Sequence, residues 1–270
     1  MKKPKISINL TTFNRASLLP RAIGSVLKQT FTSWELIVVS DASTDGTRKL
    51  LKEYAQKDNR IKPIFHKKNR GNAAARNTAL KHSRGEYVAF LDDDDEWLDQ
   101  NKLIKQLDVF KKSSNPRLAI SCTGVNLIGA DNQTTKRTVR SPQDLPKHIL
   151  KGNGIIYSPT VMTKRSIMVA VGGFDEKMPR GVDSEFYRTC IISHNLKVHF
   201  SKDITTNVYE HFGIRLTPTN SLKAIKDNLK ANTYLLQKYQ LEYIKYPLCA
   251  WVRLKTIAIN LLKLPSIILR

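Results

Sequence analysis

The sequence predicts an α/β fold with a mostly parallel sheet flanked by helices, followed by a helical C-terminal extension. Over the first ninety residues, short apolar segments alternate with helical segments of about ten residues. Such alternation is typical of βαβ units, whose right-handed crossovers produce a parallel sheet. From residue 221 onward the pattern is helical to the end. Hydrophobic residues make up 41% of the 270, enough for a folded core.

The first half is expected to contain four strands and three helices. We expect strands over 5–12, 35–40, 61–66 and 86–91, and helices over 17–29, 47–56 and 73–82. Ser17 is a candidate cap of the first helix, with Pro20 tolerated in its first turn. Ser43, Thr44 and Asp45 are candidate caps of the second.

After residue 96 the alternation breaks. A helix over 100–111 and a strand over 118–123 are expected, followed by a polar, basic segment, 131–142, that we interpret as a mobile loop. A second organised region runs over 155–208. We therefore divide the chain into two halves of one domain, 1–97 and 98–215, and a helical extension, 216–270.

The chain is strongly basic, with 45 Lys and Arg against 23 Asp and Glu and a net charge of +22. Its partners should therefore be polyanions: nucleic acid, an anionic membrane face or phosphorylated small molecules. Three widely separated cysteines argue against a disulfide scaffold or a zinc knuckle. With no apparent secretion signal and no spanning apolar segment, we expect a cytoplasmic protein.

Polar clusters follow three of the expected strands. They comprise residues 11–15 after the first strand, 40–47 after the second and 92–96 after the fourth. In open parallel sheets, ligands bind at the carboxyl ends of the strands. The three clusters therefore predict one binding site at that edge.

Four consecutive aspartates, Asp92 to Asp95, end the fourth strand. Like charges at short range raise each other's pKa, and a cation relieves that cost. A solvated acidic loop is the alternative. The position after an apolar strand, in such a basic chain, favours a site for Mg²⁺ or Mn²⁺, which prefer carboxylate oxygens.

Two further residues are candidates for ligand binding. Asp41 follows the second strand, where an acidic residue can accept hydrogen bonds from a base or ribose. Asp45 is better explained as a turn and cap residue. Arg76, in the third helix, could reach a phosphate or hold the acidic cluster, whereas Arg70 is expected at the surface.

Four ordered motifs now identify a resemblance. The segments SINLTTFNR, ELIVVSDASTDGT, RGNAAARNTAL and GEYVAFLDDDDEW resemble those of the family 2 glycosyltransferases, which have the Rossmann-like GT-A fold. The resemblance covers residues 5 to 97 and continues weakly to 215. It implies a metal-dependent, inverting transfer of a sugar from a nucleotide-diphospho-sugar, with UDP the expected nucleotide, to a hydroxyl of a glycan or lipid-linked glycan.

The resemblance also implies roles for individual residues in the nucleotide-sugar-binding half, 1–97. The base pocket would be lined by Thr11, Phe13 and Arg15, with Asp41 on the base or ribose and Arg76 nearby. Asp92 and Asp93 would contact the ribose and the donor sugar, and Asp94 would bind Mn²⁺ or Mg²⁺. The family more often has a small residue at the position of Asp93, so the metal ligand could lie one position away.

Two later segments resemble the family's acceptor-binding and catalytic half, here 98–215. Residues 172–176 match a GGFDE segment, whose Gly-Gly pair would allow the backbone to approach the donor or acceptor. Asp183 matches the general base, although Val182 replaces a preceding acid; a carboxylate favoured by a helix N-terminus explains it equally. His211 lies where the family often has a histidine, and a metal-ligand role and a structural role both remain open.

Projected as a helix, residues 248–264 place Arg253, Thr256, Asn260 and Lys263 on one narrow stripe in an apolar surround. Such a helix either packs on the domain or lies in a membrane interface with its cations at the headgroups. We favour a peripheral contact of 248–270 with an anionic membrane on its cytoplasmic face, which suits a lipid-linked acceptor.

Two other functions remain as alternatives. A non-catalytic nucleic-acid-binding protein would suit the charge, but no recognition helix or RNA-binding pattern is present, and no nucleic acid partner is expected. A nucleotidyltransferase would share the nucleotide-binding residues, but Asp183 after the Gly-Gly pair favours transfer to an acceptor hydroxyl.

Overall fold

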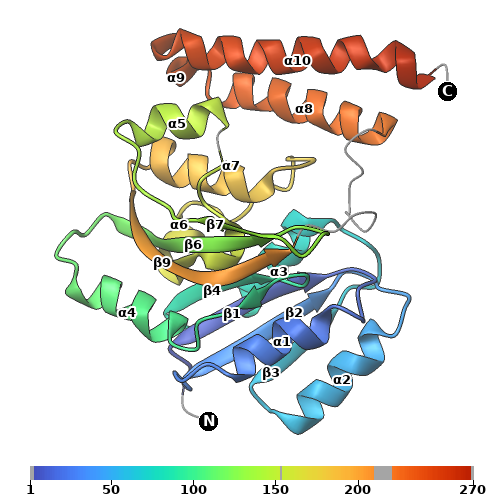
Figure 1. The fold of residues 1–270 in the computed structure, drawn as a ribbon, viewed down its shortest axis with the longest axis vertical. Helices are drawn as coiled ribbons and strands as arrows, with labels where there is room; N and C mark the ends of the chain where they lie inside the picture. Colours follow the sequence, from blue (N-terminus) through green and yellow to red (C-terminus); the bar gives the residue numbers. More distant parts are fainter. Residues whose placement is uncertain (1–2, 153, 210–220, 269–270) are drawn as a thin grey trace.

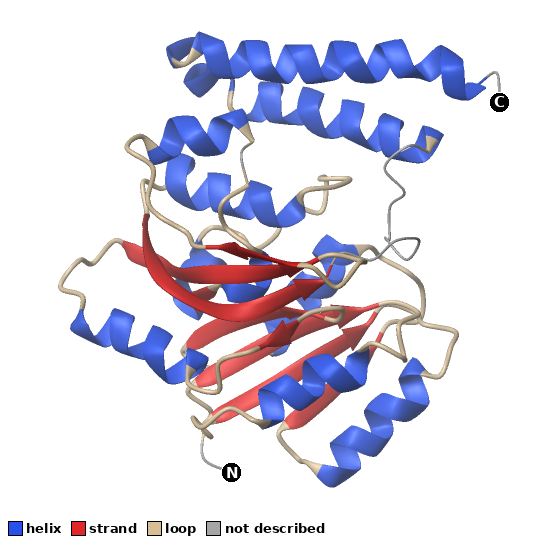
Figure 2. Ribbon diagram, in the orientation of Figure 1, coloured by secondary structure: helices blue, strands red, loops and turns tan. Residues whose placement is uncertain are grey.

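A computed structural model describes residues 3–152, 154–209 and 221–268. Within these residues, one nine-stranded sheet forms the centre of the molecule, with helices on both faces (Figures 1 and 2). Its strand order is β3-β2-β1-β4-β8-β6-β9-β5, and β7 pairs with β6.

The first half of the chain supplies the parallel part of the sheet. Its elements are β1 (Ile6–Thr12), α1 (Leu19–Leu27), β2 (Trp34–Ser40), α2 (Thr47–Lys57), β3 (Ile61–Phe65), α3 (Asn72–His82) and β4 (Tyr87–Asp92). Strands β1 to β4 are all parallel, which confirms the βαβ prediction.

The second half is less regular. Its elements are β5 (Glu96–Trp97), α4 (Lys102–Lys112), β6 (Leu118–Ile128), β7 (Thr134–Arg137), α5 (Leu145–Lys151), a 3₁₀ turn (Ser158–Thr160), β8 (Met162–Lys164), α6 (Arg165–Ala170), α7 (Val182–Arg188), a π-helical turn (Thr189–Ser193) and β9 (Lys197–Tyr209). Here the sheet is mixed, because β8 runs antiparallel to both β4 and β6, while β6 and β9 are parallel.

Three helices complete the chain: α8 (Leu222–Lys238), α9 (Gln240–Lys245) and α10 (Pro247–Ile268). They confirm the predicted helical extension. Helix α10 packs along α8 and also contacts α5, so the extension forms a layer beyond α5 and α7 (Figure 1). None of the helices in the described ranges is long and apolar enough to cross a bilayer.

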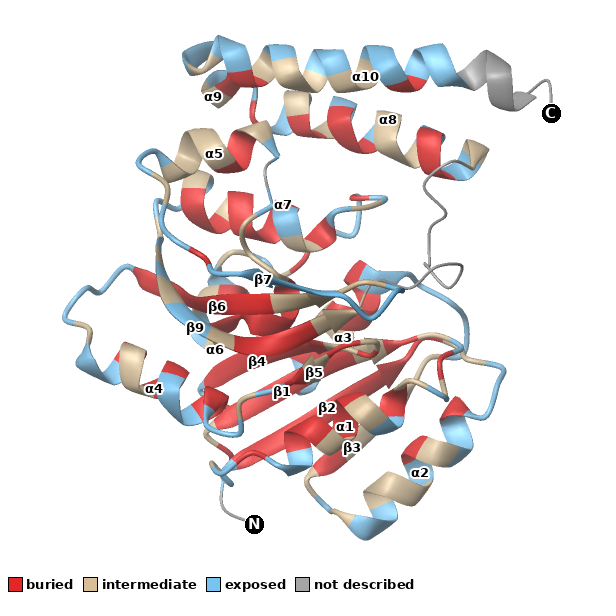
Figure 3. Cartoon of the chain, in the orientation of Figure 1, coloured by how far each residue is buried: buried red, intermediate tan, exposed pale blue. Residues whose placement is uncertain are grey.

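Alternate residues of each central strand face opposite helical layers. On β1, Ile8 and Leu10 pack into a cluster with α1 and α4. On the other face, Ile37 and Val39 of β2 pack against alanines of α3. All seven residues of β2 are buried, as expected for a strand covered on both sides (Figure 3).

Three local predictions are wrong. Helix α1 begins at Leu19 after Leu18, so Ser17 does not cap it. The segment interpreted as a mobile loop contains β7, which pairs antiparallel with β6. The N-cap of α2 is Gly46 and not Ser43, Thr44 or Asp45. Asp45 instead stabilises the turn before α2, since its carboxylate accepts hydrogen bonds from the backbone N–H groups of Ala16 and Thr47, at 3.0 Å each.

Lys102 is a buried cation in the first turn of α4. Its side chain is fully buried, its ammonium donates to Gln106 Oε1 at 2.7 Å, and it lies 4.4 Å from the centre of the Trp97 ring. Burial lowers the pKa of Lys102 to about 7, against the opposing influence of Asp99 and Cys122. The folded protein therefore releases this proton well below the pH at which the unfolded chain does.

This release predicts a pH-dependent stability. Between about pH 7 and the unfolded value of 10.5, the unfolded chain binds one more proton, so the free energy of unfolding rises with pH. Lys102→Met should remove that rise, of the order of 2–4 kcal/mol. Urea unfolding at pH 7 and pH 9.5 measures it. Lys111→Met, an exposed lysine of the same helix, is the control, and equal pH slopes in the Lys102 variant and the wild type would contradict the assignment.

Candidate functional site

A cavity of about 630 Å³ lies at the carboxyl ends of β1, β2 and β4. Because β1 lies between β2 and β4, with Thr12 opposite Ser40 and Thr11 opposite Asp92, the three predicted polar clusters are neighbours. The residues around the cavity include Thr11, Thr12, Phe13, Asp41, Arg70, Asn72, Asp93, Glu176, Arg180, Asp183 and Lys223.

Asp41 lies on one wall of the cavity and organises the turn before α3. Its carboxylate accepts hydrogen bonds from the backbone N–H groups of Arg70, at 2.9 and 3.1 Å, and Gly71, at 2.8 Å. Gly71 adopts φ +85°, a conformation that favours glycine. His66 Nδ1 lies 2.7 Å from Asp41 Oδ1, and His66 Nε2 lies 3.0 Å from the Thr78 hydroxyl. Asp41 thus faces the cavity with a fixed orientation.

Arg76 lies between two carboxylates. Its guanidinium donates to Asp92 Oδ1 at 2.8 Å and pairs with Asp183 Oδ1 at 2.7 Å. It also donates to the Ser158 hydroxyl and to Asn72 Oδ1. Burial disfavours the charge, but Asp183 and Asp92 outweigh it, and the pKa of Arg76 is raised. One buried cation therefore ties the end of β4 to the start of α7.

Arg15 holds the middle of the aspartate run. Its Nη1 donates to Asp93 Oδ1 at 2.8 Å and to Asp94 Oδ2 at 2.5 Å, and its side chain is only 6% exposed. The side chain points at the acidic run and is not among the groups that line the cavity. The predicted contact of Arg15 with the base stays a prediction.

The charged forms of Asp92 and Asp95 are disfavoured in the folded protein. Burial and the charges of Asp183, Asp94 and Asp93 raise the pKa of Asp92 to about 7, against the pull of Arg76. Burial and the charges of Asp92 and Asp94 raise the pKa of Asp95 well above its usual value. Asp95 accepts a hydrogen bond from the backbone N–H of Tyr209 at 3.1 Å. The cluster therefore carries more negative charge than its protein partners neutralise.

A divalent cation fits the chemistry of this cluster. In the described part of the chain, no three His, Cys, Asp or Glu side chains are already arranged around one point as metal ligands. However, Asp93 and Asp94 both pair with the same nitrogen of Arg15, so these two carboxylates already lie close together around one positive charge. Hard carboxylate oxygens under mutual repulsion suit Mg²⁺ or Mn²⁺.

Asp183 lies in the first turn of α7, after Gly181 with φ +68°. Its side chain is 29% exposed and lines the same cavity as Thr11, Phe13, Asp41 and Asp93. A carboxylate at a helix N-terminus is also favoured by the helix dipole. Asp183 can therefore both stabilise the start of α7 and face the cavity.

The C-terminal extension braces this helix from behind. Glu185, buried two residues after Asp183, accepts hydrogen bonds from Lys238 Nζ at 2.6 Å and the Tyr239 hydroxyl at 3.0 Å. Lys238 also pairs with Asp175 at 2.7 Å. Helix α8 therefore fixes both α7 and the 172–176 segment.

Gly173 of the Gly-Gly pair has a structural role, because it lets the backbone lie close to α3. A Cβ at Gly173 would lie 2.7 Å from Asn77 Oδ1, and Gly173 adopts φ +73°. The side-chain amide of Asn77 donates to the Phe174 carbonyl and accepts from the Phe174 backbone N–H, at 2.8 Å each. Gly173 thus approaches α3 closely, and its approach to a donor or acceptor stays a prediction.

Asp92 faces Arg76. Arg70 is exposed, as expected, and lies at the edge of the cavity with its guanidinium 4.0 Å from Glu176. His211 lies outside the described residues. Tyr209, two positions earlier, donates to Glu96 Oε1 at 2.7 Å, and Arg21 stacks 3.6 Å from the centre of its ring.

Sequence reasoning missed His66, Arg180, Lys223 and Lys238. His66 directly follows β3, so its place at a strand's carboxyl end was an available signal. Arg180 and Lys223 line the cavity, and Lys238 reaches Glu185 from a distant helix. No local pattern marks these three, because tertiary packing alone brings them to the site.

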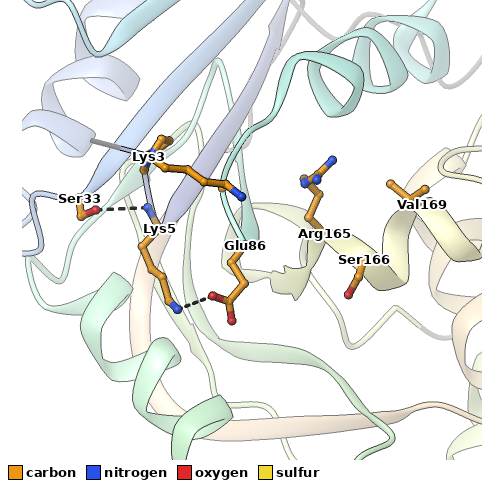
Figure 4. Close-up of a pocket in the computed structure, with 9 residues that line it drawn as sticks. Lys3, Lys5, Ser33, Glu86, Arg165, Ser166 and Val169 are labelled. Carbon is orange, nitrogen blue, oxygen red and sulfur yellow. Dashed lines mark hydrogen bonds and ion pairs between the residues drawn. The ribbon is translucent and has the colours of Figure 1, made fainter. Parts of the chain in front are cut away.

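A second hollow, of about 700 Å³, opens at the amino ends of the strands (Figure 4). Lys3, Lys5, Ser33, Glu86 and Arg165 line it. The Lys5 ammonium is paired with Glu86, and the hollow lies at the sheet edge opposite Asp183. It therefore does not contribute to the candidate site.

Comparison with known families identifies the chain. The model of the family described as Glycosyl transferase family 2 matches residues 7–169, more than half of the sequence. The chain belongs to glycosyl transferase family 2. The matched region contains the cavity residues from Thr11 to Asp93 and the whole aspartate run, and ends before Asp183.

Curated relatives of this family 2 glycosyltransferase include two bacterial enzymes. It is 39% identical over 163 residues to the putative teichuronic acid biosynthesis glycosyltransferase TuaG of Bacillus subtilis, covering 60% of this chain and 63% of that protein. It is 36% identical over 163 residues to the Escherichia coli UDP-Glc:alpha-D-GlcNAc-diphosphoundecaprenol beta-1,3-glucosyltransferase WfgD, covering 60% and 61%. The match thus spans about three-fifths of each relative.

Solved structures show that the fold is GT-A. The mannosyltransferase PcManGT from Pyrobaculum calidifontis, in complex with GDP-Man and Mn²⁺, gives a TM-score of 0.64 at 18% identity, covering 98% of this chain and 75% of that one. S. aureus TarS 1-349 in complex with UDP-GlcNAc gives 0.63 at 20% identity, covering 86% and 66%. The predicted GT-A class is confirmed.

The ion pairs of Arg76 predict how a variant should behave. Arg76→Met leaves Asp92 and Asp183 without their shared cation and should lower the free energy of unfolding by roughly 3–5 kcal/mol at pH 8. Because Asp92 is protonated more readily at lower pH, the loss should shrink at pH 5.5. Denaturant unfolding at both pH values measures this difference.

Lys105→Met is the matched control, since Lys105 forms an exposed pair with Asp99. It should cost about 1 kcal/mol or less. A loss for Arg76→Met that is small, or equal at both pH values, would show that Arg76 is not the charge link.

Proposed function

We propose that the protein transfers a sugar from a nucleotide-diphospho-sugar, with UDP as the expected nucleotide, to a hydroxyl of a glycan or lipid-linked glycan. The transfer is metal-dependent and inverts the configuration at the anomeric carbon. The observation that carries the proposal is the shared cavity. It brings together Phe13, Asp41, Asp93 and Asp183 around one space.

The relatives support this proposal. WfgD is named for UDP-glucose and a diphosphoundecaprenol-linked acceptor, TarS is described with UDP-GlcNAc, and PcManGT with GDP-Man and Mn²⁺. Family membership also favours sugar transfer over the nucleotidyltransferase and nucleic-acid-binding alternatives. The acceptor class remains a proposal, as does the contact of residues 248–270 with an anionic membrane on the cytoplasmic side.

The donor would lie along the sheet edge. Thr11, Phe13 and Asp41 would contact the base and ribose, and Asp92 and Asp93 the ribose and sugar. Arg15 would adjust the charge on Asp93 and Asp94. A divalent metal held by Asp94, when bound, would neutralise the donor diphosphate and make it a better leaving group. His211, in the same role, remains a second proposed ligand.

Asp183 is the proposed general base. The acceptor hydroxyl gives its proton to the Asp183 carboxylate while its oxygen forms a bond to the anomeric carbon. The bond from that carbon to the diphosphate breaks on the opposite face, and the nucleoside diphosphate leaves with the electron pair. Arg76 fixes Asp183 at 2.7 Å, so the carboxylate is oriented before the acceptor arrives.

Replacing the base should abolish turnover and preserve binding. Asp183→Asn retains the size of the side chain but cannot take the proton, so kcat should fall by roughly 10²–10⁴. Donor affinity should stay within about twofold, because the base does not contribute to donor binding in this scheme. Product formation and calorimetric titration with UDP measure the two quantities.

Asp108→Asn is a control of the same chemistry at the surface of α4, where Asp108 is 45% exposed. It should leave kcat unchanged. Wild-type turnover in Asp183→Asn would remove this residue from the base role.

A second variant separates the metal from the base. Asp94→Ala should weaken Mn²⁺-supported UDP binding by at least roughly tenfold and leave metal-free binding unchanged. Calorimetry with and without Mn²⁺ distinguishes the two. Asp131→Ala, at an exposed turn, is the control. Equal Mn²⁺ dependence in Asp94→Ala and wild type would assign the metal to another residue.

A further inference from the structure

We propose that the outward face of α9 and α10 is a docking surface for an anionic lipid bilayer, on which the chain lies without crossing. This docking face consists of Leu241, Ile244, Leu248, Trp251, Leu254 and Leu262. The proposal deepens the membrane contact proposed above by assigning its side chains. It rests on that part of the proposed function and not on the roles of Asp183 or Asp94.

The docking face is unusually apolar for a surface. Each of its six side chains is more than half exposed, from 54% at Leu254 to 80% at Leu262. Elsewhere in the described chain, large apolar side chains this exposed are isolated, as at Leu98 and Val169. At 100° per residue, Leu248, Trp251, Leu254 and Leu262 share one side of α10, and an exposed apolar stripe of this kind marks a surface that an apolar partner covers.

The side of α10 that packs on the domain carries polar residues, which a typical surface helix would expose. Arg253 donates to the Leu150 carbonyl at 3.2 Å and to Asn232 Oδ1 at 3.2 Å. Asn260 is buried, and its amide donates to the Thr256 carbonyl. Arg253 therefore packs against the domain and does not face headgroups. Large apolar residues of α10 are exposed instead.

Exposed lysines lie on the docking face and beside it. Lys245, Lys255 and Lys263 are exposed, and Glu242 is the one acidic residue among positions 240–270. Lys255 lies 5.2 Å from the centre of the Trp251 ring, and Lys245 lies 5.6 Å from that of Tyr246. An indole beside a long cationic side chain suits the boundary between acyl chains and headgroups.

The positive charge of the docking face favours an anionic bilayer over a second copy of the chain. Anionic headgroups attract each lysine near the surface. A second copy of the chain, paired through the same face, would instead bring together two sets of lysines with only Glu242 on each side to offset them. Since no described helix can span a bilayer, the apolar face must lie in the plane of the membrane.

Flotation of the full chain with vesicles tests the proposal. The chain should float with vesicles of phosphatidylcholine and phosphatidylglycerol, and much less with phosphatidylcholine alone. The double variant Trp251→Gln, Leu254→Gln should partition at least tenfold more weakly into the mixed vesicles. Because both side chains are exposed, its thermal unfolding should match the wild type.

The matched control is Leu98→Gln, Val169→Gln, which removes two equally exposed apolar side chains outside the docking face. It should float as the wild type does. Brominated lipid adds a site-specific readout, because Trp34 and Trp97 are buried at 2% and 4% exposure. Quenching should therefore report Trp251 and disappear in Trp251→Phe.

Four outcomes would overturn the proposal. The wild type could stay unbound with mixed vesicles, or the double variant could float as well as the wild type. Light scattering could also show a dimer that the double variant dissociates, which would make the face a contact between copies. Equal binding to pure phosphatidylcholine would overturn the anionic-lipid assignment. None of these results depends on turnover, so a failure here is distinct from a failure of the catalytic proposal.

Discussion

The site depends on one buried cation shared by two carboxylates. Arg76 joins Asp92, at the end of β4, to Asp183, at the start of α7, with contacts of 2.8 and 2.7 Å. Without it, two carboxylates of the same cavity would repel each other in a partly desolvated place, a cost that grows as the dielectric falls. The same pairing sets the distance between the proposed donor wall and the proposed base, so charge balance and catalytic geometry have one origin.

The aspartate run also depends on buried arginines for its charge balance. A body with a net charge of +22 surrounds one acidic cluster, in which Arg15 and Arg76 neutralise Asp92, Asp93 and Asp94 only in part. We propose that the remaining negative charge attracts a divalent cation and, through it, a diphosphate. The C-terminal extension adds a structural constraint: Lys238 holds Glu185 behind α7, while the opposite side of the extension faces outward.

The sequence predicted the features that depend on local pattern. Strands β1 to β4 have short apolar runs at regular spacing, and the carboxyl ends of parallel strands meet by geometry, so Asp41 and Asp93 could be expected in one place. Asp183 follows no parallel strand, and only the family resemblance indicated its place at the site. Mixed pairing of β6, β8 and β9 has no local signal, because it joins segments far apart in the chain. Periodicity also gave the two faces of α10 but not which one packs, since Asn232 and the Leu150 carbonyl provide the inward partners of Arg253.

The most direct test of this account is the position of the metal and the donor relative to Asp183. Crystals grown with a UDP-sugar and Mn²⁺ would locate the metal by its anomalous scattering. The account predicts Mn²⁺ on Asp94 beside the diphosphate, and the anomeric carbon facing Asp183 on the side away from the leaving group. A donor bound outside the cavity of Asp41 and Asp93, or Asp183 on the diphosphate side, would contradict it.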